Sequence, residues 1–386
     1  MTRIELVRIV KNFQKLLIVG SVFAIVFVLF YSFKPGYKVS DDPQVKLPPP
    51  IPKVTLESIF TKQNNVEELD SRKLIRLIAT GDVIPARGAN WPAVTSGDFT
   101  YNWKKTAAFL KKGDVTLINL ETPLTKVCPL QTEGFTFCGD SRQVQGLTYA
   151  GVDVASLANN HIGNYGQGGI DETIAILESN KLGWSGFGHL DIQEVRSVKF
   201  GFLAFNGIGT LVDREGLESE IKAARPKVDV LVVSVHWGDE YVLTPRKYGD
   251  IAPDDPQEIG HLMIDAGADL VIGNHPHTVQ GVEIYRPLRG ADCLDNPSHS
   301  RVLRSCELEE KLITYAHGNF IFDQTWSPET QEGVVGEYTF YENQLVNVLF
   351  HPILVDVSYQ PRFLSEKNGK HILDRMLKSS KLIGNN

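Results

Sequence analysis

Asparagine and histidine stand side by side in SLANNHIGN, residues 156–164, directly after the apolar run at 152–156. This pattern predicts a strand that ends in a loop presenting Asn160 and His161. An amide oxygen can bind a metal ion and an imidazole can donate a proton, so the pair suits a site at a strand end. Taken alone, the stretch is more typical of a helix cap or a turn.

Four more short apolar runs end in residues of the same kinds, at 81–82, 119–121, 236–238 and 273–277. The candidate metal ligands in these runs are Asp82, Glu121, His236, His275 and His277. Packing does not explain such a repetition. Strands that alternate with helices and carry ligand-type residues at their ends indicate a layered α/β fold, with the site along the carboxyl edge of a sheet.

Two of the histidines flank Pro276, which excludes an ordinary helix there. In an extended backbone, His275 and His277 project to the same side. Imidazoles combined with carboxylates favour divalent Zn, Mn or Fe over Ca or Mg, because calcium prefers oxygen ligands only. Two such ions, bridged by one carboxylate such as Glu121, would stabilise an attacking hydroxide and a leaving oxygen. His161 would then protonate the leaving group.

The composition narrows the range of functions. The chain has 386 residues, a formal net charge of -7 and 42% hydrophobic residues. This length suffices for one large domain or two small ones. The acidic balance, without a block of Lys and Arg, predicts no nucleic-acid partner. The glycines at 166–169 and 186–188 lack the spacing of a phosphate loop or a dinucleotide fingerprint.

An almost unbroken apolar run at 16–33 is long enough, as a helix of about 27 Å, to cross a bilayer. Arg3, Arg8, Lys11 and Lys15 precede it, so the positive-inside bias places the short N-terminus in the cytoplasm. A cleaved signal peptide is the alternative, but the run is long for one and no small-x-small pattern follows. The sequence therefore predicts a single-pass protein of the cell membrane whose main domain is extracytoplasmic.

Further patterns define the expected organisation. The stretch DDPQVKLPPPIPK at 41–53 suits an extended spacer of the polyproline type. The predicted parts are a cytoplasmic N-terminus at 1–15, a transmembrane helix at 16–33, a Pro-rich extracytoplasmic linker at 34–72, the folded domain at 73–360 and a C-terminal tail at 361–386.

The four cysteines form two locally spaced pairs, and neither pair has CxxC spacing. For a domain outside the cytoplasm, the simplest pairing is Cys128 with Cys138 and Cys293 with Cys306. Sequence alone leaves three pairings open.

In combination, these motifs resemble the CapA family of poly-γ-glutamate capsule biosynthesis proteins, whose fold is similar to that of calcineurin-like metallophosphoesterases. A membrane anchor followed by an outer domain is also similar to that family. The matching stretches are TGDV at 80–83, INLETPL at 118–124, SLANNH at 156–161, SVHWGDEY at 234–241, DAGADLVIGNHPHTVQGVEIY at 265–285 and GNFIFDQ at 318–324. The resemblance implies a layered sheet sandwich flanked by helices.

The resemblance also implies roles for individual residues. The implied ligands are Asp82 and His277 on a first metal ion, Asn160, His236 and His275 on a second, and Glu121 as the bridge, a position usually filled by Asp. His161 is implied as the proton donor. Two residues depart from the phosphoesterase pattern. Ile84 replaces the usual His, which implies a first metal site that is weak, labile or absent. His317 is either an added ligand or a surface substitution, and we favour the latter.

Two further residues are candidates for substrate binding. Arg87, shortly after the first motif, can contact an anionic substrate such as a polymer or a phosphoester, and a solvated loop arginine is the alternative. Asn319 either lies in the site or shapes a turn, and we place it in the site.

Three functional hypotheses remain. The first is a membrane-anchored, metal-dependent hydrolase or transferase that acts outside the cell on an anionic capsule polymer or a phosphoester. The second is a non-catalytic scaffold that holds the polymer, or membrane subunits of a capsule synthesis complex. The third is an anchored domain with a relic site. Ile84 favours the second hypothesis, whereas the Asn160-His161 pair favours the first.

Overall fold

The structure is a computed structural model, and it describes residues 49–287 and 309–383. Nearly all of these residues belong to one compact unit, Pro50–Asn386. The predicted transmembrane segment at 16–33 lies outside the described residues. Within the part of the chain that is described, no helix combines the length and the apolar character needed to cross a bilayer.

The first sheet has eight strands in the order β16-β15-β14-β1-β2-β5-β6, with β13 paired to β1. The strands are β1 Leu74–Val83, β2 Val115–Leu120, β5 Val154–Ser156, β6 Gly183–Ser185, β13 Asn319–Ile321, β14 Glu332–Tyr341, β15 Gln344–Leu354 and β16 Arg362–Phe363. Strands β1, β2, β5 and β6 run parallel. Their carboxyl ends therefore meet at one edge of this sheet.

The second sheet has six strands in the order β11-β12-β10-β9-β8-β7. The strands are β7 Asp191–Val195, β8 Val198–Asn206, β9 Val230–His236, β10 Leu270–Asn274, β11 Val282–Tyr285 and β12 Lys311–Thr314. Strands β8, β9, β10 and β12 run parallel, while β7 and β11 are antiparallel edge strands. A separate pair, β3 Leu124–Thr125 and β4 Gly139–Asp140, lies in the loop region that follows β2.

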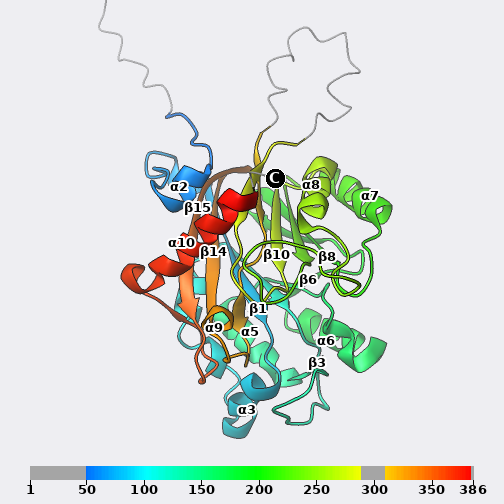
Figure 1. Ribbon diagram of the computed structural model, residues 1–386. Coiled ribbons are helices and arrows are strands. Elements are labelled where there is room, and N and C mark those ends of the chain that lie inside the picture. The colour runs from blue at the N-terminus through cyan, green and yellow to red at the C-terminus, as the bar shows by residue number, and fades with distance from the viewer. Residues whose placement is uncertain (1–48, 288–308, 384–386) are drawn as a thin grey trace, which may run out of the picture. The chain divides into compact units, whose positions relative to one another are not determined.

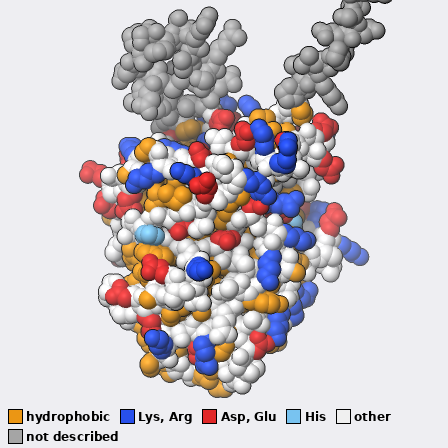
Figure 2. Space-filling view, turned by 180° about the vertical axis from the view of Figure 1, so that it is seen from behind, with side chains coloured by type: hydrophobic (Ala, Val, Ile, Leu, Met, Phe, Trp, Pro, Cys, Tyr) orange, Lys and Arg blue, Asp and Glu red, His pale blue; other side chains and the backbone are white. Residues whose placement is uncertain are grey.

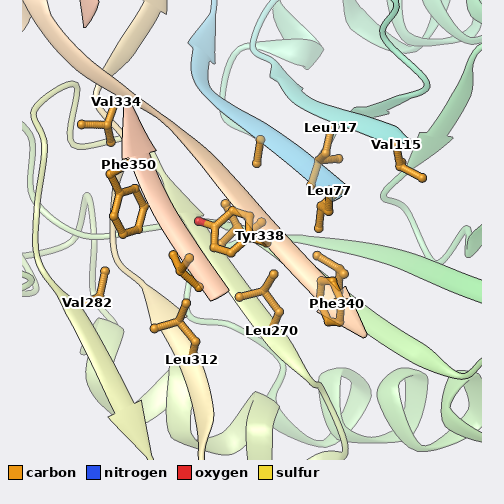
Figure 3. Packing of buried hydrophobic residues seen from close by; sticks show 14 of the residues in the cluster. Leu77, Val115, Leu117, Leu270, Val282, Leu312, Val334, Tyr338, Phe340 and Phe350 are labelled. Carbon is orange, nitrogen blue, oxygen red and sulfur yellow. The ribbon is translucent and has the colours of Figure 1, made fainter. Parts of the chain in front are cut away.

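The two sheets pack face to face around a shared hydrophobic core. Leu77 and Leu117 of the first sheet belong to the same buried cluster as Leu270 and Leu312 of the second, with Tyr338 among them (Figure 3). The strands read as nearly continuous Val, Ile and Leu runs because both faces of each central strand are covered. The predicted mixed α/β architecture is thus confirmed.

Helices cover the outer faces of both sheets (Figure 1). The helices are α2 Leu56–Phe60, α3 Arg87–Ser96, α4 Ala107–Leu110, α5 Val144–Ala150, α6 Gly166–Ser179, α7 Arg214–Ala224, α8 Pro256–Ala266, α9 Pro328–Gln331 and α10 Glu366–Ile383. Helix α8 shows how the sequence sets these bounds: the Asp255 side chain accepts from the Gln257 N–H, Pro256 occupies the first turn and Gly267 ends the helix.

Residues 361–383, set apart in the sequence as a tail, form β16 and α10. Helix α10 lies against β11 of the second sheet and β15 of the first (Figure 1). The Val282 N–H donates to Ser380 Oγ at 2.8 Å, and Ile372 joins the core between the sheets. This helix therefore helps to hold the two sheets together.

The described surface carries charges of both signs. On the face seen in Figure 2, acidic and basic side chains lie interspersed.

Two of the four cysteines are paired. Cys128 and Cys138 form a disulfide, as predicted. The other two cysteines, Cys293 and Cys306, lie outside the described residues.

Candidate metal centre

Strand register brings the polar strand ends together. In the first sheet, Asp82 is paired with Asn119 of β2 on one side and with Asn319 of β13 on the other. In the second sheet, His236 at the end of β9 is paired with Asn274, the residue before His275. Because parallel strands end at the same edge, residues far apart in sequence meet there.

Three overlapping groups of side chains have ligand atoms within 4.8 Å of one another and could hold a metal ion. The groups are Glu121 with His236 and His275, Asp82 with Glu121 and His277, and Glu240 with His275 and His277. We call the first group, together with Asn160, the His236 half, and the second group the His277 half. Glu121 belongs to both halves. The structure thus brings all six ligands expected from the sequence into one cluster.

The His236 half converges on one nitrogen atom. His236 Nε2 lies 2.9 Å from Asn160 Oδ1, 3.1 Å from His275 Nδ1 and 3.3 Å from Glu121 Oε1. Burial lowers the pKa of His236 to about 3 and holds the pKa of His275 well below its usual value. Both imidazoles are therefore neutral at pH 7, which is the form that binds metals.

Glu121 is fully buried, and neither of its carboxyl oxygens has a hydrogen-bond partner among the described residues. Burial, and then the nearby charge of Asp82, raise the pKa of Glu121 well above its usual value. The buried Nε2 of His275 also lacks a partner there. Each such atom costs about 1–3 kcal/mol of desolvation that nothing offsets. A divalent cation held by these atoms would satisfy them, so the residues fit a metal.

The His277 half is organised by hydrogen bonds. Asp82 Oδ1 accepts from Asn119 Nδ2 at 2.8 Å. His277 Nδ1 lies 3.1 Å from Asp82 Oδ2 and 3.0 Å from Asn319 Oδ1, and since both are acceptors, this nitrogen carries the proton. The remaining nitrogen, Nε2, is the one available to a metal ion. A carboxylate behind the distal nitrogen of a histidine is a common support for metal ligands.

The charges in the His277 half are strongly coupled. Burial alone would lower the pKa of His277, but the carboxylates of Glu121 and Asp82 outweigh it and raise the pKa to about 9. Burial alone would likewise raise the pKa of Asp82, but its hydrogen bond with His277 lowers it. Binding of a cation at His277 would therefore release a proton.

The backbone between the two histidines is not extended, which corrects the prediction from the sequence. His275 has φ 98° and His277 has φ 55°, both in regions that non-glycine residues rarely adopt. Each such residue costs about 1–3 kcal/mol and persists only where the surroundings hold it. The Tyr241 N–H contributes by donating to Pro276 O, between the two histidines, at 2.9 Å. The two imidazoles still converge, with ring centroids 5.8 Å apart.

At position 84, both the side chain and the residues around it are apolar. Ile84 is fully buried and forms a small hydrophobic cluster with Ala86, Phe137 and Phe322. The Phe322 ring also lies 5.3 Å from the His277 ring. Hydrophobic side chains thus line the His277 half on this side.

His161 is held from two sides. Its Nδ1 lies 3.0 Å from Asn164 Oδ1, and the Phe137 ring lies 4.1 Å from the imidazole. The Phe137 N–H also donates to Asn164 Oδ1, at 2.6 Å. Burial lowers the pKa of His161 to about 4. An anionic group beside the ring would raise this pKa, because opposite charge favours the protonated form.

The two residues predicted to bind substrate, Arg87 and Asn319, already contact other side chains of the protein. Arg87 pairs with Asp323, donates to Gly134 O at 2.9 Å and lies over the Phe137 ring. Asn319 is buried, and besides its contact with His277 it donates to Thr330 O at 3.0 Å. In this arrangement Asn319 orients His277.

His317 is not a surface residue, so the prediction from the sequence is wrong, and it belongs to none of the three ligand groups. The side chain is fully buried. Its Nε2 lies 2.9 Å from the Tyr338 hydroxyl and its Nδ1 3.3 Å from Thr80 O. Tyr338 belongs to the core between the sheets, so this histidine is part of the packing.

Sequence reasoning missed four residues of the site. Asn119 donates to Asp82, and Asn159 Nδ2 donates to Asn119 Oδ1 at 3.2 Å. Glu240 belongs to a ligand group, and Phe137 stacks on His161. Of these, Asn119, Asn159 and Glu240 stand in the strand-end motifs, so their positions were a usable signal; nothing local marks Phe137.

Comparison with known proteins places the chain in a family. Residues 76–324 match the family described as "Bacterial capsule synthesis protein PGA_cap". The chain belongs to this family. It is 26% identical over 307 residues to "Capsule biosynthesis protein CapA" of Bacillus anthracis, covering 72% of this chain and 66% of the relative.

The chain is also similar to "PGA biosynthesis protein CapA" of Bacillus subtilis. The two are 26% identical over 264 residues, which cover 60% of this chain and 59% of the relative. The chain thus spans about two thirds or less of the length of these relatives.

Among solved structures, a putative 5'-nucleotidase from Staphylococcus aureus matches with a TM-score of 0.42 and 14% identity, covering 79% of this chain and 58% of that one. With a TM-score below 0.5, it supports no conclusion.

Proposed function

We propose that this chain is a membrane-anchored, extracytoplasmic protein that acts in the synthesis or export of an anionic capsule polymer such as poly-γ-glutamate, through a hydrolase-type site that depends on divalent metal ions. The observation that carries this proposal is the position of Glu121, which is shared by two ligand groups while both of its buried oxygens lack hydrogen-bond partners among the described residues. Membership of the PGA_cap family and the names of the two Bacillus relatives support the capsule polymer as the substrate class.

Two ions are expected, and the donor set favours Zn, Mn or Fe. The His236 half would hold one and the His277 half the other, with Glu121 as the bridge. When bound, such ions supply Lewis-acid chemistry and make water a stronger nucleophile at neutral pH. A fold similar to that of metallophosphoesterases fits this arrangement.

Other side chains of the protein would donate a proton, position the proton donor and contact the substrate. Once an anionic substrate beside the ring has raised the pKa of His161, the protonated imidazole would donate its Nε2 proton to the leaving group, because Nδ1 donates to Asn164 Oδ1. Phe137 keeps the imidazole in place, and together with Ile84 it excludes water from that side. Arg87 can contact an anionic substrate by exchanging its pairing with Asp323.

The anchor and the compartment belong to the same proposal. The apolar run at 16–33 would hold the domain at the outer side of the membrane. The Cys128–Cys138 disulfide suits an oxidising compartment outside the cytoplasm. Expected partners are the membrane, the anionic polymer and membrane subunits of a capsule synthesis complex, with no nucleic acid.

One observation favours a second candidate function, a non-catalytic scaffold that binds metal or polymer. Ile84 and its hydrophobic neighbours stand where the phosphoesterase pattern has a ligand. A weakened first metal site would reduce turnover and still leave a cation that attracts an acidic polymer.

Metal content and turnover of the full-length chain, purified in detergent, test both candidates. We would measure bound Zn, Mn and Fe by elemental analysis, hydrolysis of 4-nitrophenyl phosphate esters and of poly-γ-glutamate, and binding of poly-γ-glutamate. His161→Gln is the matched variant, because it removes the proton donor and leaves every candidate ligand.

The outcomes separate the candidates. Two equivalents of metal, with turnover that His161→Gln abolishes, would establish the hydrolase. Metal and polymer binding without turnover would favour the scaffold. A folded protein that binds polymer but takes up no Zn, Mn or Fe would overturn the hydrolase and favour the scaffold, and one that binds neither metal nor polymer would overturn both.

A further inference from the structure

The His277 half needs a further ligand, and position 84 cannot supply it. Within this half, Asp82 and Glu121 approach His277 from the first sheet. The remaining side near Phe322 is hydrophobic, and Ile84 has no atom that binds a metal. Any additional ligand must come from another element.

Glu240 is placed to provide one. This residue follows β9 by four positions, and its Oε1 lies 3.9 Å from His277 Nε2. It also forms a ligand group with His275 and His277, with all three ligand atoms within 4.8 Å of one another. We propose that Glu240 is a metal ligand that takes the place left by Ile84 and completes the His277 half. This inference rests on the proposed metal-dependent function and adds a ligand to it.

The distance between the Glu240 carboxylate and the His277 imidazole suits two ligands of the same cation. At 3.9 Å, Glu240 Oε1 and His277 Nε2 are too far apart for a hydrogen bond. Two ligands that each lie about 2.0–2.2 Å from one zinc ion are separated by at most about 4.4 Å. The observed separation therefore suits two groups that bind the same ion.

The loop that carries Glu240 is built into the site. The Tyr241 N–H donates to Pro276 O at 2.9 Å, between the two ligand histidines. The Thr278 hydroxyl donates to Val242 O at 2.7 Å on the other side of that loop. Positive φ values at Gly238 and Tyr241, 78° and 59°, turn the chain so that these bonds can form. Glu240 is thus held above the histidines by backbone contacts.

A second observation concerns His275, which shares a ligand group with Glu240 and His277. The Nε2 atom of His275 is buried and has no partner among the described residues. In His277, the hydrogen bonds of Nδ1 to Asp82 and Asn319 leave Nε2 for another group. Two imidazoles and one carboxylate form a donor set typical of Zn, Mn and Fe sites.

Metal titration of the full-length protein tests the proposal. After removal of metal with a chelator, Zn²⁺ or Mn²⁺ is added, and stoichiometry and affinity are measured by calorimetry and by elemental analysis. The test variant is Glu240→Gln. The control is Glu218→Gln on α7, which makes the same change in charge at a side chain that is also 37% exposed.

We expect two equivalents in the wild-type protein and in Glu218→Gln. In Glu240→Gln, one equivalent should keep its affinity, while the other is weakened by more than the roughly 10–100-fold that loss of an outer-shell partner causes. Adding Ile84→His to Glu240→Gln should restore the second equivalent. Because Glu240 is partly exposed, the metal-free variant should unfold at the wild-type temperature, and the single substitution decides the question even if the double variant does not fold.

Other results would overturn the proposal in distinguishable ways. Two equivalents of unchanged affinity in Glu240→Gln would exclude Glu240 as a ligand and leave the proposed function intact. One equivalent in the wild-type protein would show that the His277 half is not filled, which also removes the role of Glu240. No uptake by the folded wild-type protein would overturn the proposed function itself.

Discussion

The two halves of the ligand cluster share Glu121 but differ in their surroundings. In the His236 half, three ligand atoms lie within 3.3 Å of His236 Nε2, and burial keeps the imidazoles neutral. In the His277 half, carboxylates raise the pKa of His277 to about 9, and Ile84 lines one side. In the second case a cation must displace a proton from the imidazole of His277, whereas the imidazoles of the first are already neutral. We therefore expect the His236 half to bind metal more tightly.

The halves also show how the fold and the site depend on each other. The oxygen ligands Asp82, Glu121 and Asn160 lie at or just beyond the ends of strands of the first sheet, and the ligand histidines lie at or just beyond the ends of strands of the second. A bound ion would thus connect the two sheets. Since a ligand that binds only the folded state stabilises it, metal should raise the unfolding temperature of the sandwich.

The largest effect is expected for Glu121→Gln, because Glu121 belongs to both halves. Both equivalents should be weakened by more than about 10–100-fold, measured by calorimetric titration with Zn²⁺. Without metal, the variant should be about as stable as the wild-type protein, since Gln is also buried but carries no charge for burial to penalise. Retention of one tight equivalent would show that the halves do not share this residue.

A comparison of His236→Ala with Asp82→Asn separates the halves. We expect His236→Ala to remove the tight equivalent and Asp82→Asn to remove the weaker one, because each residue occurs in one half only. His236→Ala should also lower the free energy of unfolding by about 1–3 kcal/mol, since it leaves buried polar partners unsatisfied. Loss of the same equivalent in both variants would mean that the cluster holds a single ion.

Much of the site could be predicted from the sequence because its signals are local. Each ligand follows a short apolar run, and such runs predict buried strands without knowledge of the partners. Asp255 and Pro256 likewise defined the start of α8 from neighbouring residues.

Sequence reasoning failed where contacts between distant parts of the chain determine the position of a side chain or the backbone conformation. His317 was placed at the surface, but Tyr338 and Thr80 hold it in the core. His275 and His277 were expected in an extended backbone, yet the Tyr241 N–H fixes the peptide between them from another loop. The role of Phe137 depends on a disulfide loop folding back onto His161, which no local pattern indicates.

A smaller effect is expected for Phe137→Ala, which should change His161 and leave every candidate metal ligand in place. With its stacking partner removed, His161 becomes more exposed, and its pKa should rise from about 4 toward 6.5. This shift is measurable by NMR titration of the imidazole. If the protein hydrolyses 4-nitrophenyl phosphate, kcat should fall by up to about 10²-fold, the lower end of what a general acid supplies.

The matched control is Phe135→Ala, two positions earlier in the same disulfide loop and 81% exposed. It should leave the His161 pKa, the turnover and the metal content unchanged. An unchanged His161 pKa in Phe137→Ala would show that stacking does not position this residue.

The smallest effect is expected for Glu337→Gln, which contrasts a hydrogen-bonded carboxylate of the first sheet with Glu121, whose oxygens accept no hydrogen bond from the described residues. Glu337 Oε2 lies 2.9 Å from His351 Nε2, and Oε1 lies 3.3 Å from Arg76 Nε. The hydrogen bond with His351 lowers the pKa of Glu337 below 4.5. Its contribution to stability is therefore present above the unfolded-state pKa and is lost as the pH falls through the lowered folded-state pKa.

At pH 7, Glu337→Gln should lower the free energy of unfolding by about 0.5–1 kcal/mol, and metal binding should stay unchanged. The difference from the wild-type protein should shrink as the pH is lowered below 4.5, which urea unfolding of the metal-free protein at several pH values can measure. A difference that does not vary with pH would mean that packing, and not the ion pair, is what Glu337 contributes. The contrast would then rest on burial alone, because Glu121 is fully buried and Glu337 is partly exposed.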